Sequence, residues 1–254
     1  GILVNSKYKA NFIYDNLAIQ NNIIHGCYIN KIKNLIFLGS SCIYPRICSQ
    51  PIKEKYLLSG QLEKTNEAYA IAKIAGIKMC ESYNFQYKTD YKCLMPCNIY
   101  GPNDNYHPQN SHVIAALIRK FLIAKKNNLS SVECWGTGSA FREFMHVDDL
   151  ADAIIFCLEN WDPADQKSPK DSSGKPLNHL NVGTGKDISI KELSIKIANL
   201  TKFTGEIIWD ESKPDGTPKK VLDVSRINNL GWYAKIDLLT GLSRTIEKLD
   251  IESI

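Results

Sequence analysis

Apolar residues recur along the chain with two different periods, and this alternation predicts the fold. Over residues 12–29 they return every three or four positions, as on one face of a helix. After a polar break at 31–34, a continuous apolar run at 35–38 ends at Gly39. Such a run is typical of a strand buried on both faces of a parallel sheet. We therefore expect a helix and then a central strand, with residues 40–42 at its carboxyl end.

The same alternation continues toward the carboxyl terminus. A long excursion at 45–67 contains two prolines and one glycine, and Thr65 or Asn66 can cap a helix that runs past residue 79. We expect further strands at 93–95 (broken by Pro96), 132–135, 180–183 and 207–208, helices at 112–122, 147–158, 189–200 and 238–249, and a loop at 136–142. Helices that alternate with apolar strands predict a parallel α/β sheet flanked by helices.

Composition and charge narrow the class of protein. The 254 residues are 44% hydrophobic, which is enough for a full core, and the formal net charge of +4 is dispersed. This charge does not favour nucleic-acid binding, although it is compatible with an anionic small substrate. No apolar stretch reaches the roughly 20 residues that cross a bilayer, and the eight cysteines lack paired metal-ligand spacing. We expect a cytoplasmic protein without a metal site, a membrane segment or a nucleic-acid partner.

Tyr69 and Lys73 carry the strongest chemical signal. Their spacing of four places both side chains on one face of the predicted helix. An ammonium beside a phenol favours the phenolate, which makes the tyrosine a usable acid or base near neutral pH. The spacing alone also fits a surface pair, but Ser40 at the end of the preceding strand can hydrogen-bond a carbonyl beside Tyr69. Together the three residues predict a site that polarises a carbonyl.

Several segments around these residues resemble the extended short-chain dehydrogenases, also called the NAD-dependent epimerase/dehydratase family. They are GSSCIYP at 39–45, the Tyr69–Lys73 pair, MPCNIYGP at 95–102 and REFMHVDD at 142–149. The resemblance to members that convert GDP-4-keto-6-deoxy-D-mannose to GDP-L-fucose extends through SHVI at 111–114, NVGTG at 181–185 and KPDGTPKK at 213–220. It implies a homodimeric, NADPH-dependent enzyme that epimerises C3 and C5 and reduces C4.

The resemblance also implies which residues act. Ser40, Tyr69 and Lys73 would reduce the carbonyl, while Cys42 is the expected base and His112 the expected acid of epimerisation. A thiolate can remove a hydrogen that the neighbouring ketone acidifies, and an imidazolium can return one to the other face. The residues expected to line the cofactor are Leu38, Gly39, Ser40, Ser41, Tyr69, Lys73, Pro96, Cys97, Asn98, Ile99 and His112. Those expected to bind the GDP-sugar are Lys120, Trp135, Arg142 and Asp215.

The family's domain plan implies a Rossmann-like NADP-binding domain over 1–102. The rest, 103–254, would mainly form a smaller substrate-binding α/β region, with segments near 145–160 and 178–185 returning to the first domain. The sequence has no GxxGxxG turn to hold the cofactor pyrophosphate at a helix amino end. Because the other matches stay collinear, we expect that about 60 residues, at about 30 per βαβ unit, precede Gly1 in the parent protein. The choice between NADPH and NADH therefore stays open.

Two alternative functions remain at this stage. A nucleotide-sugar 4-epimerase or 4,6-dehydratase of the same superfamily is one, although Cys42 together with His112 argues against both. The other is a truncated, non-catalytic binding or dimerisation module. Intact Ser40, Tyr69 and Lys73 argue against loss of function by substitution, but they do not argue against loss by truncation.

Overall fold

Three parallel strands form the sheet on which the rest of the molecule is built. The computed structural model describes residues 2–213 and 215–250. Gly1, the residue that the expected preceding segment would join, lies outside the described residues. The strands are β1 (Asn34–Leu38), β2 (Asp90–Pro96) and β6 (His179–Val182), in the order β1-β2-β6. The central strand β2 is buried from its second residue onward. The Rossmann-like parallel sheet flanked by helices is confirmed.

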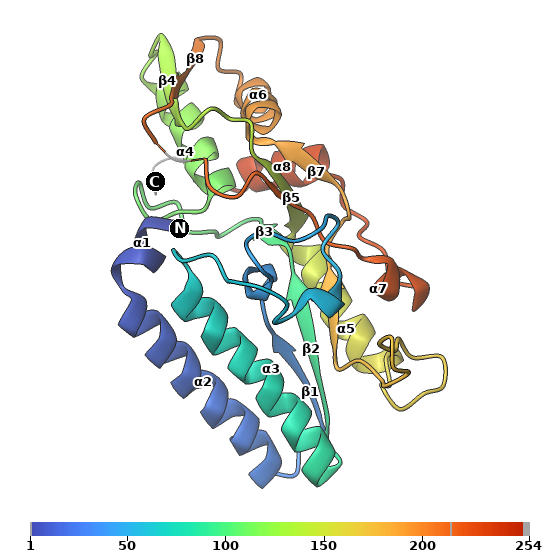
Figure 1. Cartoon of the computed structure of the whole chain (residues 1–254). Coiled ribbons are helices and arrows are strands. Elements are labelled where there is room, and N and C mark those ends of the chain that lie inside the picture. Colours follow the sequence, from blue (N-terminus) through green and yellow to red (C-terminus); the bar gives the residue numbers. More distant parts are fainter. Residues whose placement is uncertain (1, 214, 251–254) are drawn as a thin grey trace.

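Helices cover both faces of this sheet (Figure 1). The helices α2 (Lys9–Ile29) and α3 (Glu67–Tyr87) lie side by side on one face, α5 (Val147–Asn160) lies on the other, and a short α1 (Ile2–Lys7) precedes α2. Gly76 lets α3 approach β1 closely, because a side chain at this position would collide with the ring of Phe37. No helix among the described residues, α2 and α3 included, is long and apolar enough to cross a membrane.

A second hydrophobic core lies at the other end of the molecule. It is enclosed by α4 (Val113–Lys126), β4 (Ser131–Trp135), α6 (Ile190–Thr201), β8 (Glu206–Asp210) and α8 (Leu238–Glu247), with β4 and β8 paired in parallel. Phe121, Leu193 and Leu242 are fully buried in it. The predicted capping box is present, because Ser189 accepts the backbone N–H of Glu192 at 3.1 Å and Glu192 reaches back to the Ser189 backbone.

A small mixed sheet joins the two cores, and most of it was not expected. Its strands are β3 (Asn98–Tyr100), β5 (Phe141–His146), β7 (Asp187–Ser189) and β9 (Lys219–Lys220), with β5 paired to the other three. The loop expected at 136–142 is therefore wrong at its end, because residues 141 and 142 pair with both β7 and β9. Pro96 also does not break β2 early. It is the last residue of that strand, and the Cys97 N–H continues the ladder to the Val182 carbonyl.

The excursion after β1 is fixed by a buried polar network. It contains the short helices η1 (Ser41–Ile43) and η2 (Glu54–Tyr56), and it packs near α7 (Ser225–Asn229). The Glu54 carboxylate accepts the Asn181 backbone N–H at 3.1 Å and pairs with Arg226 at 2.9 Å. The Asn181 side chain donates to the Ile52 carbonyl at 2.8 Å and accepts the Tyr44 hydroxyl at 2.6 Å. The segment that carries Cys42 is thus tied to the end of β6.

Leu94→Ala should lower the free energy of unfolding by about 2–5 kcal/mol, because Leu94 is fully buried at the centre of β2 and its loss leaves a cavity. Urea denaturation measures the change. The control is Leu239→Ala on α8, where the side chain is half exposed and a change within about 0.5 kcal/mol is expected. Similar small losses in the two variants would contradict the central position of β2 in the core.

Candidate active site

Ser40 and Cys42 stand at the carboxyl end of β1, where open α/β sheets bind ligands. The Gly39 N–H donates to the Leu94 carbonyl at 2.9 Å, so the β1–β2 ladder continues up to the site. Ser40 has an extended backbone and caps η1, since its Oγ accepts the Cys42 N–H at 3.2 Å. Both side chains are half-buried.

Tyr69 and Lys73 approach the same point from the first turns of α3. The Tyr69 hydroxyl hydrogen-bonds with Ser40. The Lys73 Nζ donates to the Leu38 carbonyl at 3.1 Å and lies 5.7 Å from the centroid of the Tyr69 ring. The structure therefore brings the four expected residues at 40, 42, 69 and 73 into one cluster.

The surroundings shift the pKa values of Cys42 and Tyr69 in opposite directions. Burial raises the pKa of the Cys42 thiol, but the Lys220 ammonium and hydrogen bonds with Ser40 and Lys220 outweigh burial, so the net pKa lies below its ordinary value. Burial raises the pKa of Tyr69 to about 12, the charge of Cys42 adds to this effect, and Ser40 opposes it. Lys73 was expected to lower the pKa of Tyr69, and this lowering is not seen. The Lys73 ammonium is directed at the Leu38 carbonyl, and burial lowers its own pKa.

Two charged residues near the cluster were not singled out from the sequence. The Lys220 Nζ lies 3.5 Å from the Cys42 Sγ. Glu143 is fully buried in β5, and its carboxylate accepts the backbone N–H groups of Gly185 and Leu222, each at 2.7 Å. Each lies inside a segment that carries the family resemblance, but no spacing in the sequence distinguishes Lys220 from the adjacent Lys219. For Glu143, the signal was an acid that directly precedes the apolar pair Phe144 and Met145 in β5.

The segment 96–99 follows β2 and faces the same end of the sheet. The Asn98 side chain donates to the Glu143 carbonyl at 2.7 Å, so it is fixed to β5. Cys97 is buried, and burial raises the pKa of its thiol well above the ordinary value. The surroundings therefore shift the thiol pKa upward at Cys97 and downward at Cys42.

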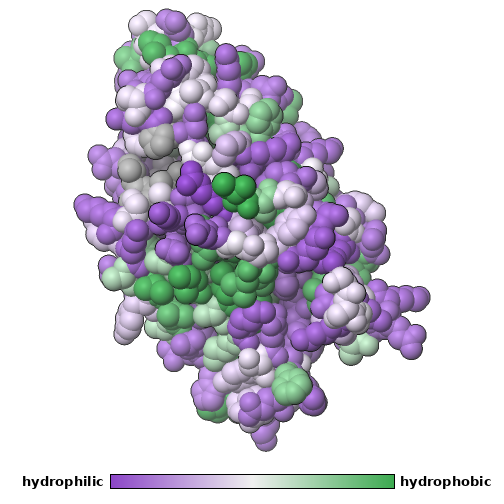
Figure 2. All heavy atoms as spheres, viewed as in Figure 1, coloured by the Kyte–Doolittle hydropathy of each residue, from purple (hydrophilic) through white to green (hydrophobic). Residues whose placement is uncertain are grey.

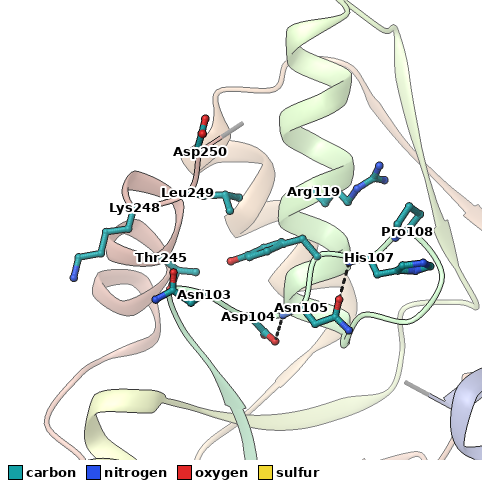
Figure 3. Close-up of a pocket in the computed structure, with 11 residues that line it drawn as sticks. Asn103, Asp104, Asn105, His107, Pro108, Arg119, Thr245, Lys248, Leu249 and Asp250 are labelled. Carbon is teal, nitrogen blue, oxygen red and sulfur yellow. Dashed lines mark hydrogen bonds between the residues drawn. The ribbon is translucent and has the colours of Figure 1, made fainter. Parts of the chain in front are cut away.

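His112 is the N-cap residue of α4, at the end of a loop that is held by hydrogen bonds within the loop. Within that loop the Asn105 N–H donates to Asp104 and the His107 N–H donates to Asn105, as Figure 3 shows. A cavity of about 500 Å³ lies between the loop, Arg119 of α4 and the end of α8, and none of the expected catalytic residues lines it. Although part of the His112 side chain is exposed, desolvation of its imidazole by the surrounding residues lowers its pKa, and the charge of Asp104 opposes this. No hydrogen bond joins it to Cys42 in the described part of the chain.

Lys120 and Trp135 form a second group on α4 and β4. The Lys120 Nζ donates to the Glu133 carbonyl at 2.7 Å and lies 5.6 Å from the Trp135 ring centroid, and the Lys213 Nζ lies 5.9 Å from that ring. The Trp135 side chain is 48% exposed. The group is a half-exposed aromatic ring with two cations placed over it.

Arg142 and Asp215 lie between the two groups. Burial lowers the pKa of Arg142, and the charge of Asp215 opposes this. Both oxygens of Asp215 are engaged by Thr137, through its backbone N–H and its hydroxyl, each at 2.8 Å. Arg142 of β5 is the register partner of Lys220 in β9, so Arg142 adjoins the Cys42 cluster.

The model of the NAD-dependent epimerase/dehydratase family matches residues 1–183. The chain belongs to this family. Among curated members, GDP-L-fucose synthase of Escherichia coli strain K12 is 51% identical over 247 residues, which make up 97% of this chain and 76% of that protein. Putative GDP-L-fucose synthase 2 of Arabidopsis thaliana is also 51% identical, over 97% of this chain and 71% of that protein.

Solved structures of the family agree with the fold. A GDP-6-OMe-4-keto-L-xylo-heptose reductase from C. jejuni is 40% identical with a TM-score of 0.87, over 96% of this chain and 78% of that chain. A GDP-mannoheptose C4 reductase from Campylobacter jejuni, solved with NADP bound, is 40% identical with a TM-score of 0.85, over 96% of this chain and 76% of that chain.

Glu143 should make stability depend on pH. Burial raises its pKa to about 7 from an ordinary value of 4.5, with hydrogen bonds from Leu222 and Gly185 opposing. Between these pH values the folded state holds a proton that the unfolded chain has lost, so rising pH destabilises the fold. Glu143→Gln cannot titrate. The free energy of unfolding of the wild type minus that of the variant should therefore fall by up to about 1.4 kcal/mol per pH unit in this window.

Urea denaturation at several pH values measures this difference. Glu133→Gln on the exposed side of β4 is the matched control, and it should leave the slope unchanged. Parallel pH profiles for the wild type and Glu143→Gln would show that the carboxyl does not titrate in this window.

Proposed function

We propose that this chain carries the catalytic residues of an enzyme that converts GDP-4-keto-6-deoxy-D-mannose to GDP-L-fucose by 3,5-epimerisation and NADPH-dependent 4-reduction. The observation that carries the proposal is a thiol of lowered pKa, Cys42, beside the carbonyl-reducing residues Ser40 and Tyr69. A 4-epimerase has no need of such a base, and the family resemblance implies an acidic pair in place of this thiol in 4,6-dehydratases. The names of the two curated relatives, GDP-L-fucose synthase and putative GDP-L-fucose synthase 2, support the same product.

The residues present fit the nicotinamide end of the cofactor. Lys73 places a half-buried ammonium at the carboxyl end of β1, where it can hydrogen-bond a ribose hydroxyl, and Leu38, Ser41 and the segment 96–99 line the same end of the sheet. The 254 residues contain no GxxGxxG turn for the pyrophosphate. In this proposal residues 1–102, with segments near 145–160 and 178–185, hold the cofactor, and the rest of 103–254 holds the nucleotide sugar.

Epimerisation requires one base and one acid. The Cys42 thiolate takes the proton from a carbon beside the C4 ketone, and the electron pair of the broken C–H bond moves to the C4 oxygen as an enolate. His112 then returns a proton to the opposite face of that carbon, while the enolate electrons re-form the C–H bond. Ser40 hydrogen-bonds the C4 oxygen while it carries negative charge.

Reduction requires Tyr69 to be protonated, whereas epimerisation requires Cys42 to be ionised. NADPH supplies the hydride that C4 receives. A phenol with a pKa of about 12 stays protonated at neutral pH, so Tyr69 is ready to give its proton to the C4 oxygen. Its raised pKa therefore suits a reductase, in which the tyrosine acts as an acid.

The second group of residues suits a guanosine diphosphate. The half-exposed indole of Trp135 can stack with a base, and the Lys120 ammonium placed over the ring supplies positive charge beside it. The planar guanidinium of Arg142 can bind two phosphate oxygens at once. Asp215 holds the loop at 136–139 through Thr137 beside this position.

We also propose a homodimer formed through α2 and α3. The outer face of α3 carries Ile71 and Phe85, which are 43% and 83% exposed, and α2 adds Ile19 and Ile23. Figure 2 shows hydrophobic residues gathered across the middle of the viewed face, over the upper turns of α3. An apolar face of this kind fits an isologous interface. The eight free thiols fit the reducing cytosol.

Cys42→Ser should abolish epimerisation and leave reduction in place. In deuterated water, exchange at C3 and C5 of the substrate should fall by at least about a hundredfold, the contribution of one general base. Mass spectrometry measures exchange, and NADPH absorbance with product identification measures reduction. Cys27→Ser, a half-buried thiol on α2, is the control. Undiminished exchange would refute the role of Cys42, and a folded wild type that ignores this substrate would refute the proposed function.

Ile19→Asp should shift the protein from dimer to monomer, because it places a charge in the proposed apolar interface. Light scattering after gel filtration measures the mass. Ile195→Asp on α6, where the side chain is 45% exposed, should leave the mass unchanged. A dimer that survives the substitution at 19 would exclude this face as the interface.

A further inference from the structure

Lys220 is directed at the Cys42 thiol and not at a carboxylate. Its Nζ lies 3.5 Å from the Sγ of a residue 178 positions earlier in the chain. It forms no ion pair within the described residues, whereas the adjacent Lys219 pairs with Asp187 at 2.9 Å. Successive side chains of a strand point to opposite sides, so β9 turns one lysine to the surface and the other inward.

The segment after β9 is fastened to the excursion that carries Cys42. The Ile52 N–H donates to the Val221 carbonyl, and the Asp223 N–H donates to the Ile52 carbonyl, both at 2.8 Å. The Val221 N–H donates to the Gln50 side chain at 3.0 Å. The backbone beside Lys220 therefore moves with the backbone that follows Cys42, and their separation is set by the fold.

Lys220 is the cation that lowers the pKa of Cys42. The groups that face this thiol or Lys220 from the surrounding elements are Ser40, Cys48, Tyr69, Cys97, Arg142 and Glu143. Burial raises the pKa values of the Cys48 and Cys97 thiols, and that of Tyr69 is about 12. These three groups are therefore neutral near pH 7. Lys73 is engaged by the Leu38 carbonyl. Without Lys220, only the hydrogen bond with Ser40 would oppose the rise in the Cys42 pKa that burial causes.

We propose that Lys220 is the positioning residue that holds Cys42 as a thiolate and so makes it the base of the epimerisation. This inference rests on the proposed function. The ammonium keeps its own protons throughout. When the substrate proton moves from carbon to sulfur, the thiolate charge next to Lys220 is lost and negative charge appears on the C4 oxygen, held by Ser40.

The test compares the pH dependence of two measurements on the full-length protein. The variants are Lys220→Met, which removes the charge, Lys220→Arg, which keeps it, and Lys219→Met as the matched control. The first measurement is the rate at which iodoacetamide alkylates Cys42, followed by peptide mass spectrometry without substrate. The second is deuterium exchange at C3 and C5 of GDP-4-keto-6-deoxy-D-mannose.

Lys220→Met should move the alkylation profile to higher pH and slow alkylation at pH 7 on the order of tenfold, with a matching loss of exchange. Lys220→Arg should retain most of both, and Lys219→Met should equal the wild type. If Lys220→Met misfolds by circular dichroism, Lys220→Gln replaces it. A wild-type alkylation profile in the charge-removing variant overturns the inference even if exchange falls. A wild type with an acidic thiol that exchanges neither carbon overturns the proposed function instead, and the inference with it.

Discussion

The buried carboxylate of Glu143 is the constraint on which the site depends. It accepts backbone N–H groups from Gly185, after β6, and from Leu222, after β9, while its own backbone lies in β5. Its backbone carbonyl also receives the Asn98 side chain from the start of β3. Four segments far apart in the sequence therefore meet at one residue between the two cores. Gly183 permits this closeness, because a side chain there would collide with the carboxylate.

Given that scaffold, the chemistry follows from two unlike environments a few atoms apart. Cys42 and Tyr69 share Ser40 as a hydrogen-bond partner and are both shielded from water, which by itself disfavours their charged forms. Only Cys42 has a cation directed at it. The pKa of Cys42 is thus lowered and that of Tyr69 is raised, which are the directions that the proposed base of an epimerase and the proposed acid of a ketone reductase require.

The parallel sheet and the first cluster were predictable from sequence because local patterns encode them. The run at 35–38 marked β1, and the spacing of Tyr69 and Lys73 marked one helix face, with Ser40 placed opposite by strand topology. The joining sheet was not predictable, because β3, β7 and β9 are each three residues or shorter and owe their strand conformation to β5. The pKa of Tyr69 was missed for a similar reason, since it depends on where the Lys73 ammonium is directed.

The separation of Cys42 from Lys220 has a consequence for reactivity. In an unfolded chain two residues 178 positions apart do not share a local field, so the thiol titrates as an ordinary cysteine. The ammonium reaches the sulfur only after β9 has paired with β5 and the 221–223 backbone has joined the excursion at 50–52. The lowered pKa of the Cys42 thiol therefore arises from the assembled joint between the two cores, close to Arg142. Lys220 and Arg142, the proposed diphosphate-binding residue, are placed by the same pair of strands, β9 and β5.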